Sequence, residues 1–161
     1  MKNISEQLGR LLSNHKQTLA VAESCTGGAI SSALTDIPGS SAYFGYGIVS
    51  YSNQAKEKLL GVSQDTLKQF GAVSRQTAVE MADGVRRLAS ADYGLSVTGI
   101  AGPGGATASK PVGLVFVGFS YSQFNVWHEL KLSGTRQEIR EATVKSALEF
   151  ALEKIEDLLS N

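Results

Sequence analysis

The chain has 161 residues, and its 15 Lys and Arg residues balance its 15 Asp and Glu residues, so the formal net charge is zero. A chain of this length can bury about two thirds of its unfolded surface without disulfides or metal ions, and we expect one domain over residues 1–161. The charge balance argues against a nucleic-acid-binding module, and no apolar run is long enough to span a bilayer. The single cysteine excludes an internal disulfide and favours a reduced, cytoplasmic setting.

The first half of the chain alternates helical and strand patterns. Apolar residues at helical spacing predict a helix up to about residue 15, and the apolar run at 18–22 predicts a buried strand. Further on, the patterns predict a turn at Ser24 with a helix to about residue 34, and then a strand at 46–51. A short helix carrying Lys56 follows, then a loop, helix and loop through Phe70, and finally a longer helix capped by Ser74.

The second half completes an α/β pattern. Strands are predicted at 93–97 and 112–119, the second being apolar enough for a sheet covered on both faces. An alternating strand should place one face in the core, and a capping box at Thr135 and Glu138 opens a long final helix. The alternating face consists of Phe124, Val126, His128, Leu130 and Leu132. Strands interleaved with helices predict a three-layer α/β/α sandwich with a mixed, mostly parallel central sheet.

Three predicted strands end in loops rich in small and hydroxyl residues. In open α/β sheets, ligands bind outside the carboxyl ends of the parallel strands. We therefore expect side chains and backbone of these three loops to line a binding site. The candidate substrate-binding residues from the loops are Cys25, Thr26, Gly27, Gly28, Tyr51, Asn53, Thr98 and Gly99.

Ser24 stands where a strand is predicted to turn into a helix. The first N–H groups of a helix have no partner within it, and together with the helix dipole they stabilise an anion or a developing oxyanion. The turn is not a Walker loop, because no lysine follows Gly28. Ser24 can be interpreted as a reactive hydroxyl or simply as the cap of the helix.

Lys56 is predicted to project from an apolar helix face, between Leu59 and Leu60. Burial lowers the pKa of a lysine, and a neutral amine can remove the proton of Ser24 without a histidine. Together with oxyanion stabilisation, this pair suits hydrolysis of an amide or ester without a cofactor. The alternative is a lysine whose head group reaches solvent along its own stem.

Other reactive groups have weaker support. Cys25 could be a nucleophile, but it needs a base, and the two histidines are predicted far from it, His15 at the opposite end of the sheet and His128 in the core. No residues have the spacing of metal ligands, so no metal is predicted. Arg136 and Arg140 lie on one face of the last helix, where they either clamp a phosphate or form a solvated charged face.

Six segments carry a family resemblance: residues 22–28, 38–41, 51–53 with Lys56, 71–74, 98–103 and 110–113. In this order they resemble the C-terminal domain of the competence/damage-inducible protein CinA, and the resemblance covers nearly the whole chain. Stand-alone members of that family are nicotinamide mononucleotide deamidases. The resemblance therefore implies hydrolysis of nicotinamide mononucleotide to nicotinic acid mononucleotide and ammonia, in pyridine nucleotide salvage. The expected partners are a small-molecule pyridine nucleotide and further copies of the chain in a homo-oligomer, with no nucleic acid, membrane or cofactor.

The same resemblance assigns roles to individual residues. It makes Ser24 the nucleophile, Lys56 its base and Thr98 with the glycine loop a substrate contact. It also makes an arginine of the last helix either the ligand of the phosphate or an organiser of the site, and we favour Arg136 over Arg140 as the phosphate ligand. One position departs from the family pattern of Gly-Asp-Arg, because Thr135 replaces the aspartate. A paralogue of weakened activity, acting as a non-catalytic nucleotide-binding or regulatory domain, is the alternative.

Overall fold

Five strands form one mixed sheet in the computed structural model, which describes residues 1–122 and 124–160. The strand order is β2-β1-β3-β4-β5; β1 is parallel to β2 and β3, whereas β4 is antiparallel to β3 and β5. The predicted fold class is confirmed. The strands are β1 (Leu19–Glu23), β2 (Phe44–Val49), β3 (Tyr93–Gly99), β4 (Leu114–Tyr121) and β5 (Phe124–Lys131).

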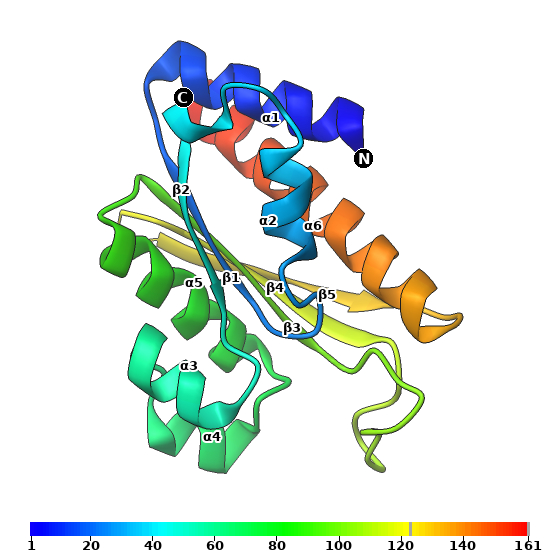
Figure 1. Cartoon of the computed structure of the whole chain (residues 1–161). Helices are drawn as coiled ribbons and strands as arrows, with labels where there is room; N and C mark the ends of the chain where they lie inside the picture. Colours follow the sequence, from blue (N-terminus) through cyan, green and yellow to red (C-terminus); the bar gives the residue numbers. More distant parts are fainter. Residues whose placement is uncertain (123, 161) are drawn as a thin grey trace.

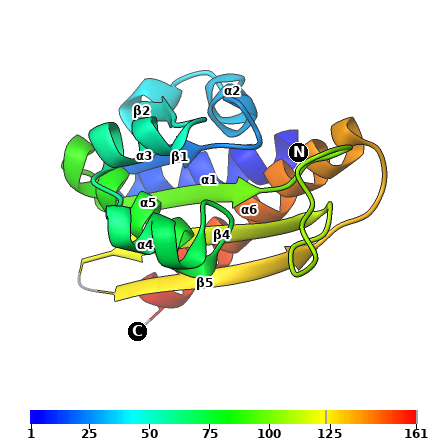
Figure 2. The same cartoon turned by 90° about the horizontal axis from the view of Figure 1, so that it is seen from below.

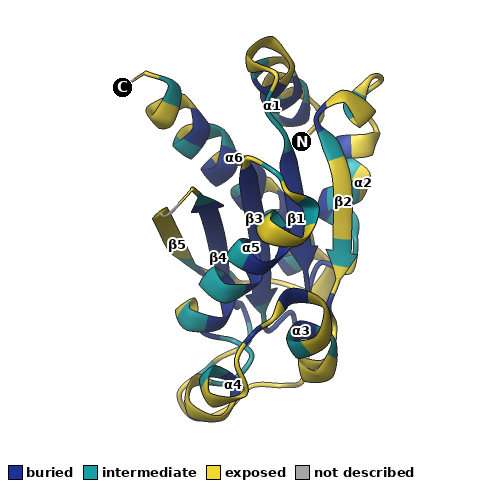
Figure 3. Cartoon of the chain, turned by 90° about the vertical axis from the view of Figure 1, so that its left-hand side faces the viewer, coloured by how far each residue is buried: buried dark blue, intermediate teal, exposed yellow. Residues whose placement is uncertain are grey.

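Helices cover both faces of the sheet, as Figure 1 and the view from below in Figure 2 show. One face carries α1 (Lys2–His15), α2 (Ala29–Thr35) and α6 (Arg136–Leu159), and the other carries α3 (Asn53–Leu60), α4 (Gln64–Phe70) and α5 (Arg75–Ala89). A short 3-10 helix, η1 (Ser40–Ala42), precedes β2. The core lies around β1, β3 and β4, whereas the edge strands β2 and β5 are largely exposed (Figure 3). No helix of the described residues is both long and apolar enough to cross a membrane.

The parallel register brings the ends of three strands to one edge of the sheet. Glu23, the last residue of β1, is paired with Val49 of β2 and with Val97 of β3. The loops that follow these strands therefore leave the sheet side by side, and α6 begins at the same edge because β5 ends there, beside the start of β4. This edge is the one at which the sequence predicts a binding site.

The predicted core face of β5 is confirmed at Leu130, which is buried, and Leu132, which packs against the core, but it is wrong for the first part of the strand. Phe124 is 70% exposed and Val126 39% exposed, and His128 is an exposed residue whose ring stacks on Phe150, with centroids 5.5 Å apart. The reason is that β5 is an edge strand, whereas α6 packs over the central strands β3 and β4. Alternating apolar residues indicated a strand correctly but could not show how far the covering helix extends.

One strand end also differs from the prediction. The structure ends β2 at Val49, two residues before the predicted end, because the carbonyl of Ser50 binds a lysine side chain instead of a neighbouring strand. The helix after the Ser24 turn begins at Ala29 and ends at Thr35, close to its predicted end at residue 34. Both segments belong to the loops and elements around the predicted site.

Candidate active site

Ser24 and Lys56 are in contact at the carboxyl edge of the sheet. Nζ of Lys56 donates hydrogen bonds to Oγ of Ser24, at 3.1 Å, and to the carbonyl oxygen of Ser50, at 2.8 Å. Lys56 is 1% exposed, so the interpretation that its head group reaches solvent is wrong. Burial lowers the pKa of Lys56 from 10.5 to about 8, against a small opposing effect of the Cys25 thiol. A lysine with this pKa is mostly charged at pH 7, and the neutral amine beside the serine hydroxyl becomes the main form above about pH 8.

Helix α3 carries this lysine inward on a narrow buried face. The helix starts at a serine cap, Ser52, whose side chain accepts the N–H of Ala55 at 3.0 Å. Only Lys56 and Leu60 of the helix are buried, while Leu59, predicted to share their face, is 48% exposed. The lysine thus replaces an apolar residue at the centre of the contact between α3 and the rest of the protein.

Ser24 lies in a four-residue turn and does not cap α2. The helix begins at Ala29, and its cap position is Gly28, whose φ of 99° is favourable only for glycine. Gly27, with φ of 59°, also adopts the left-handed conformation. The two glycines let the chain turn sharply, so that the Ser24 side chain faces α3. The capping interpretation of Ser24 is wrong.

The start of α2 holds an anion, and that anion is the protein's own Glu23. The carboxylate is fully buried and accepts five hydrogen bonds of 2.5–3.1 Å. The donors are the N–H groups of Gly28, Ile30 and Ser31 and the hydroxyls of Thr26 and Ser31. The predicted use of these helix-start N–H groups for a substrate oxyanion is therefore wrong. Among the described residues, the N–H groups of Cys25 and Thr26 donate to no backbone carbonyl.

Arg136 and Arg140 of α6 have different contacts although they lie one helical turn apart. Arg140 donates from Nε to the carbonyl of Cys25 at 3.1 Å and from Nη2 to the carbonyl of Thr26 at 2.9 Å, and so holds the turn after Ser24 in place. Arg136 donates to the carbonyl of Gly102 at 2.7 Å and to the hydroxyl of Tyr51 at 3.2 Å. Only Arg136 borders the cavity beside the Ser24–Lys56 pair.

A cavity of about 250 Å³ opens beside the pair. Seven of the predicted site residues line it, namely Ser24, Cys25, Tyr51, Lys56, Thr98, Gly99 and Arg136. Five others do not: Thr26, Gly27, Gly28 and Arg140 belong to the turn and its support, and Asn53 is exposed at the start of α3.

The loop 100–105 and residues 72–73 complete the lining of the cavity. The glycine content of the loop indicated its part in the site, whereas Ala72 and Val73 were not predicted. Their sequence signals were the resemblance segment 71–74 and the neighbouring cap of α5, Ser74, which fixes the chain before the helix. In the fold, the carbonyl of Ala72 accepts the hydroxyl of Thr98 at 2.7 Å, and this bond brings the two residues to the cavity.

Cys25 borders the cavity but is poorly suited to be a nucleophile. Its side chain packs in the main hydrophobic cluster, and burial raises the pKa of the thiol to about 11. The thiolate, which is the reactive form, is therefore scarce at neutral pH. The geometry favours Ser24 over the thiol alternative.

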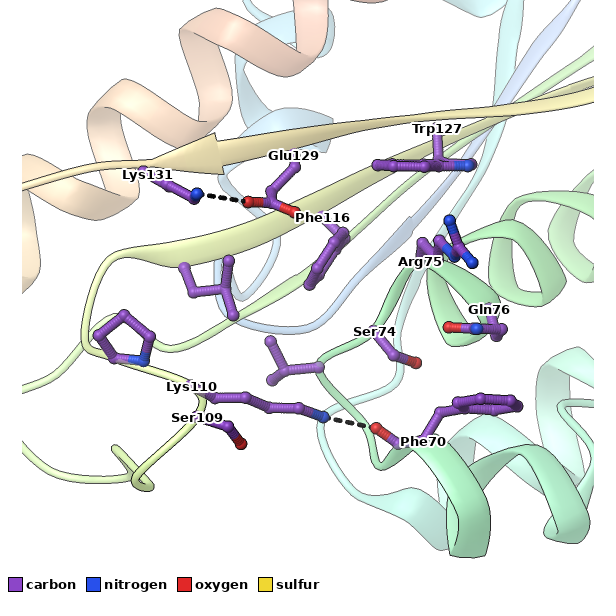
Figure 4. A pocket seen from close by; sticks show the side chains of 13 residues that line it. Phe70, Ser74, Arg75, Gln76, Ser109, Lys110, Phe116, Trp127, Glu129 and Lys131 are labelled. Carbon is purple, nitrogen blue, oxygen red and sulfur yellow. Dashed lines mark hydrogen bonds and ion pairs between the residues drawn. The ribbon is translucent and has the colours of Figure 1, made fainter.

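A larger groove of about 680 Å³ lies between the start of α5 and strands β4 and β5 (Figure 4). Arg75 stacks over the ring of Trp127 at 5.3 Å, and Lys131 pairs with Glu129 at 3.2 Å across the top of the groove. The Ser74 hydroxyl that faces the groove is engaged as the cap of α5. Lys110 donates to the carbonyl of Phe70, so both lysines of the groove have other partners, and no described serine of the groove is hydrogen-bonded to a lysine as in the smaller cavity.

The fold and the site define an α/β protein with a buried serine–lysine pair at the carboxyl edge of its parallel strands. The sequence model described as the CinA C-terminal domain matches residues 1–155. The chain belongs to this family.

Known proteins are similar over nearly the whole chain. A CinA-like protein of Endomicrobium trichonymphae is 53% identical over 147 residues, which cover 91% of this chain and 34% of that protein. The chain spans about a third of the length of the curated relatives that it matches.

The crystal structures of relatives have the same fold. The competence/damage inducible protein CihA from Agrobacterium tumefaciens has a TM-score of 0.91 and 45% identity, and the match covers 94% of each chain. The competence damage-inducible protein A from Klebsiella pneumoniae has a TM-score of 0.93 and 30% identity, and the match covers 96% of each chain.

Thr135, the departure from the family pattern, still caps α6. Its side chain accepts the N–H of Glu138 at 3.3 Å, and its own N–H donates to the carboxylate of Glu138 at 2.7 Å. The predicted capping box is confirmed. The position of Arg136 at the start of α6 is therefore kept without the aspartate.

Proposed function

We propose that the protein hydrolyses the carboxamide of nicotinamide mononucleotide to nicotinic acid mononucleotide and ammonia. The observation that carries the proposal is the 3.1 Å contact between Nζ of Lys56 and Oγ of Ser24, with both groups buried. A serine beside a lysine of lowered pKa is a nucleophile with its base. Membership of the CinA family supports the choice of a pyridine nucleotide, in the salvage of these compounds in the cytoplasm.

In the proposed mechanism, neutral Lys56 donates one N–H to the carbonyl of Ser50, so that its lone pair accepts the proton of Ser24. The serine oxygen attacks the carboxamide carbon, and the carbonyl oxygen becomes an oxyanion. The N–H groups of Cys25 and Thr26 are the donors proposed for it. Lys56 then gives its proton to the departing nitrogen, ammonia leaves, and water hydrolyses the acyl-enzyme by the same steps.

Arg136 is the proposed ligand of the 5′-phosphate. It borders the cavity, and its present acceptors, a carbonyl and a hydroxyl, are neutral, so a phosphate can replace them with a stronger, charged acceptor. Arg140 has the supporting role of holding the turn that presents Ser24.

Ammonia release from nicotinamide mononucleotide by the purified protein tests the proposal. We expect turnover by the wild type, binding without turnover by Ser24→Ala, and loss of turnover by Lys56→Ala. Because Lys56 must be neutral, kcat/KM should rise with pH through about 8, the lowered pKa of this lysine. Wild-type turnover by Ser24→Ala would overturn the covalent mechanism.

The replacement of the family's aspartate by Thr135 favours a second candidate, a non-catalytic nucleotide-binding or regulatory domain. In that case the wild type would bind the nucleotide at the same cavity, and ammonia release would be absent from it as well as from the variants. The same assay therefore separates the two functions.

A homo-oligomer is the proposed assembly. The edge strand β5 exposes Phe124, Val126 and Trp127, which are 70%, 39% and 41% exposed. Apolar residues on an open strand edge favour association, because unpaired backbone groups and apolar surface are covered together. Light scattering of the wild type and of Phe124→Ser measures the assembly.

A further inference from the structure

The hydroxyl of Thr98 is buried beside the reactive pair, and the direction of its hydrogen bond is fixed. Oγ1 lies 2.7 Å from the carbonyl oxygen of Ala72, and Thr98 is 1% exposed. A carbonyl oxygen carries no proton, so the hydroxyl must donate. Its single proton is then used, and towards the cavity the oxygen of Thr98 can only accept.

Thr98 is also a close neighbour of Ser24. In the parallel pairing of β1 with β3, Glu23 is the partner of Val97, and the N–H of Ser24 donates to the carbonyl of Val97 at 3.1 Å. Ser24 and Thr98 each come directly after one residue of this pair, on adjacent strands that lie about 5 Å apart. Both residues line the cavity together with Lys56.

We propose that Thr98 is the residue that fixes the orientation of the carboxamide and rejects the carboxylate. This inference rests on the proposed function. A carboxamide has an oxygen that only accepts and a nitrogen that only donates, so Thr98 can pair only with the nitrogen. Lys56 must reach the same nitrogen to protonate it as it leaves. The nitrogen thus lies between Lys56 and Thr98, and the carbonyl oxygen faces the N–H groups after Ser24.

The same polarity weakens binding of the product. A carboxylate places an oxygen where the amide nitrogen was, facing a hydroxyl oxygen that has no proton to give. Turning the hydroxyl towards the carboxylate would take its hydrogen bond from the buried carbonyl of Ala72. Sites built around a substrate N–H reject analogues that lack it, so we expect the amide to bind at least about tenfold more tightly than the acid.

The experiment measures binding by calorimetry in a Ser24→Ala background, in which turnover does not interfere. The ligands are nicotinamide mononucleotide, nicotinic acid mononucleotide and the methyl ester of the acid, which is neutral at the acyl group but has no N–H. In the parent variant, the amide should bind at least about tenfold more tightly than either analogue. Thr98→Val should reduce these ratios to within about threefold, and Thr98→Ser should keep them.

The outcomes separate this inference from the proposed function. Equal binding of amide and ester in the parent, or an unchanged ratio in Thr98→Val, overturns the inference; the parent comparison needs no folded Thr98 variant. A preserved ratio without ammonia release from the wild type overturns the deamidase function alone. If the parent binds none of the three ligands, both fail.

Discussion

Two buried ionisable groups lie on opposite sides of the turn after β1, and they differ in how well hydrogen bonds stabilise their charge. On the side facing α2, the Glu23 carboxylate is fully buried and accepts five hydrogen bonds. On the side facing the cavity, Lys56 is 1% exposed and contacts only two neutral oxygens, those of Ser24 and Ser50. The Glu23 carboxylate and the Lys56 ammonium are almost equally buried, but only the carboxylate has enough hydrogen bonds to offset the loss of water. The carboxylate therefore contributes to stability, whereas the lysine is held in a state that favours loss of its proton.

The largest expected effect comes from replacing Lys56, the proposed base. We expect Lys56→Met to lower kcat for ammonia release roughly 10³-fold, because Ser24 loses its base. Lys58→Met is the matched control, since Lys58 is an exposed lysine of the same helix and should leave kcat unchanged. Retention of a tenth of the activity by Lys56→Met would contradict the assigned role.

Removing the compensated charge should instead cost stability. Glu23→Gln introduces an amide group among five donors that require acceptors, and we expect it to lower the free energy of unfolding by roughly 3–5 kcal/mol. Urea unfolding measures the loss. Glu156→Gln, at an exposed position of α6, is the control and should change stability little. A loss as small as that of the control would mean that the helix start does not need its anion.

The pH dependence of stability tests whether Lys56 is uncompensated. Lowering its pKa from 10.5 to about 8 corresponds to roughly 3 kcal/mol of destabilisation when the lysine is charged. Between pH 8 and 10.5 the unfolded chain binds the proton and the folded protein does not, so stability rises with pH. Relative to Lys56→Met, the wild type should be less stable at pH 7, and the difference should shrink through this range. A difference independent of pH would show that the lysine is compensated.

The two arginines of α6 should affect different kinetic constants, because one borders the cavity and the other holds the turn. We expect Arg136→Gln to raise KM for nicotinamide mononucleotide about tenfold and to leave kcat nearly unchanged, because it removes the phosphate ligand. Arg140→Gln should lower kcat, because the turn that presents Ser24 loses two hydrogen bonds. Steady-state kinetics of both variants measure these effects. A lower kcat in Arg136→Gln and a higher KM in Arg140→Gln would show that the two arginines have the opposite roles.

The smallest effect is expected at Cys25. Cys25→Ala should change kcat less than about threefold, because a thiol with its pKa raised to about 11 supplies little thiolate. Alkylating reagents should likewise leave activity intact. Loss of activity in Cys25→Ala or after alkylation would support Cys25 as the nucleophile.

The sequence by itself determined the fold class, and it named Ser24 and Lys56 as candidates for a pair. Hydrophobic periodicity predicted the alternation of helices and strands, because it reports which face of each element is apolar. Ser24 directly follows one strand, and Lys56 lies in the short helix that follows the next parallel strand; the two could therefore meet, since parallel strands bring their carboxyl ends together.

Only the tertiary structure decided where each charge is satisfied. The sequence could not show that Glu23 occupies the start of α2, that Arg140 supports the turn, or that His128 lies exposed on an edge strand. Nor could it decide whether Lys56 reaches solvent or Ser24. These outcomes depend on contacts between residues far apart in the chain, and no local pattern determines burial or the direction of a hydrogen bond.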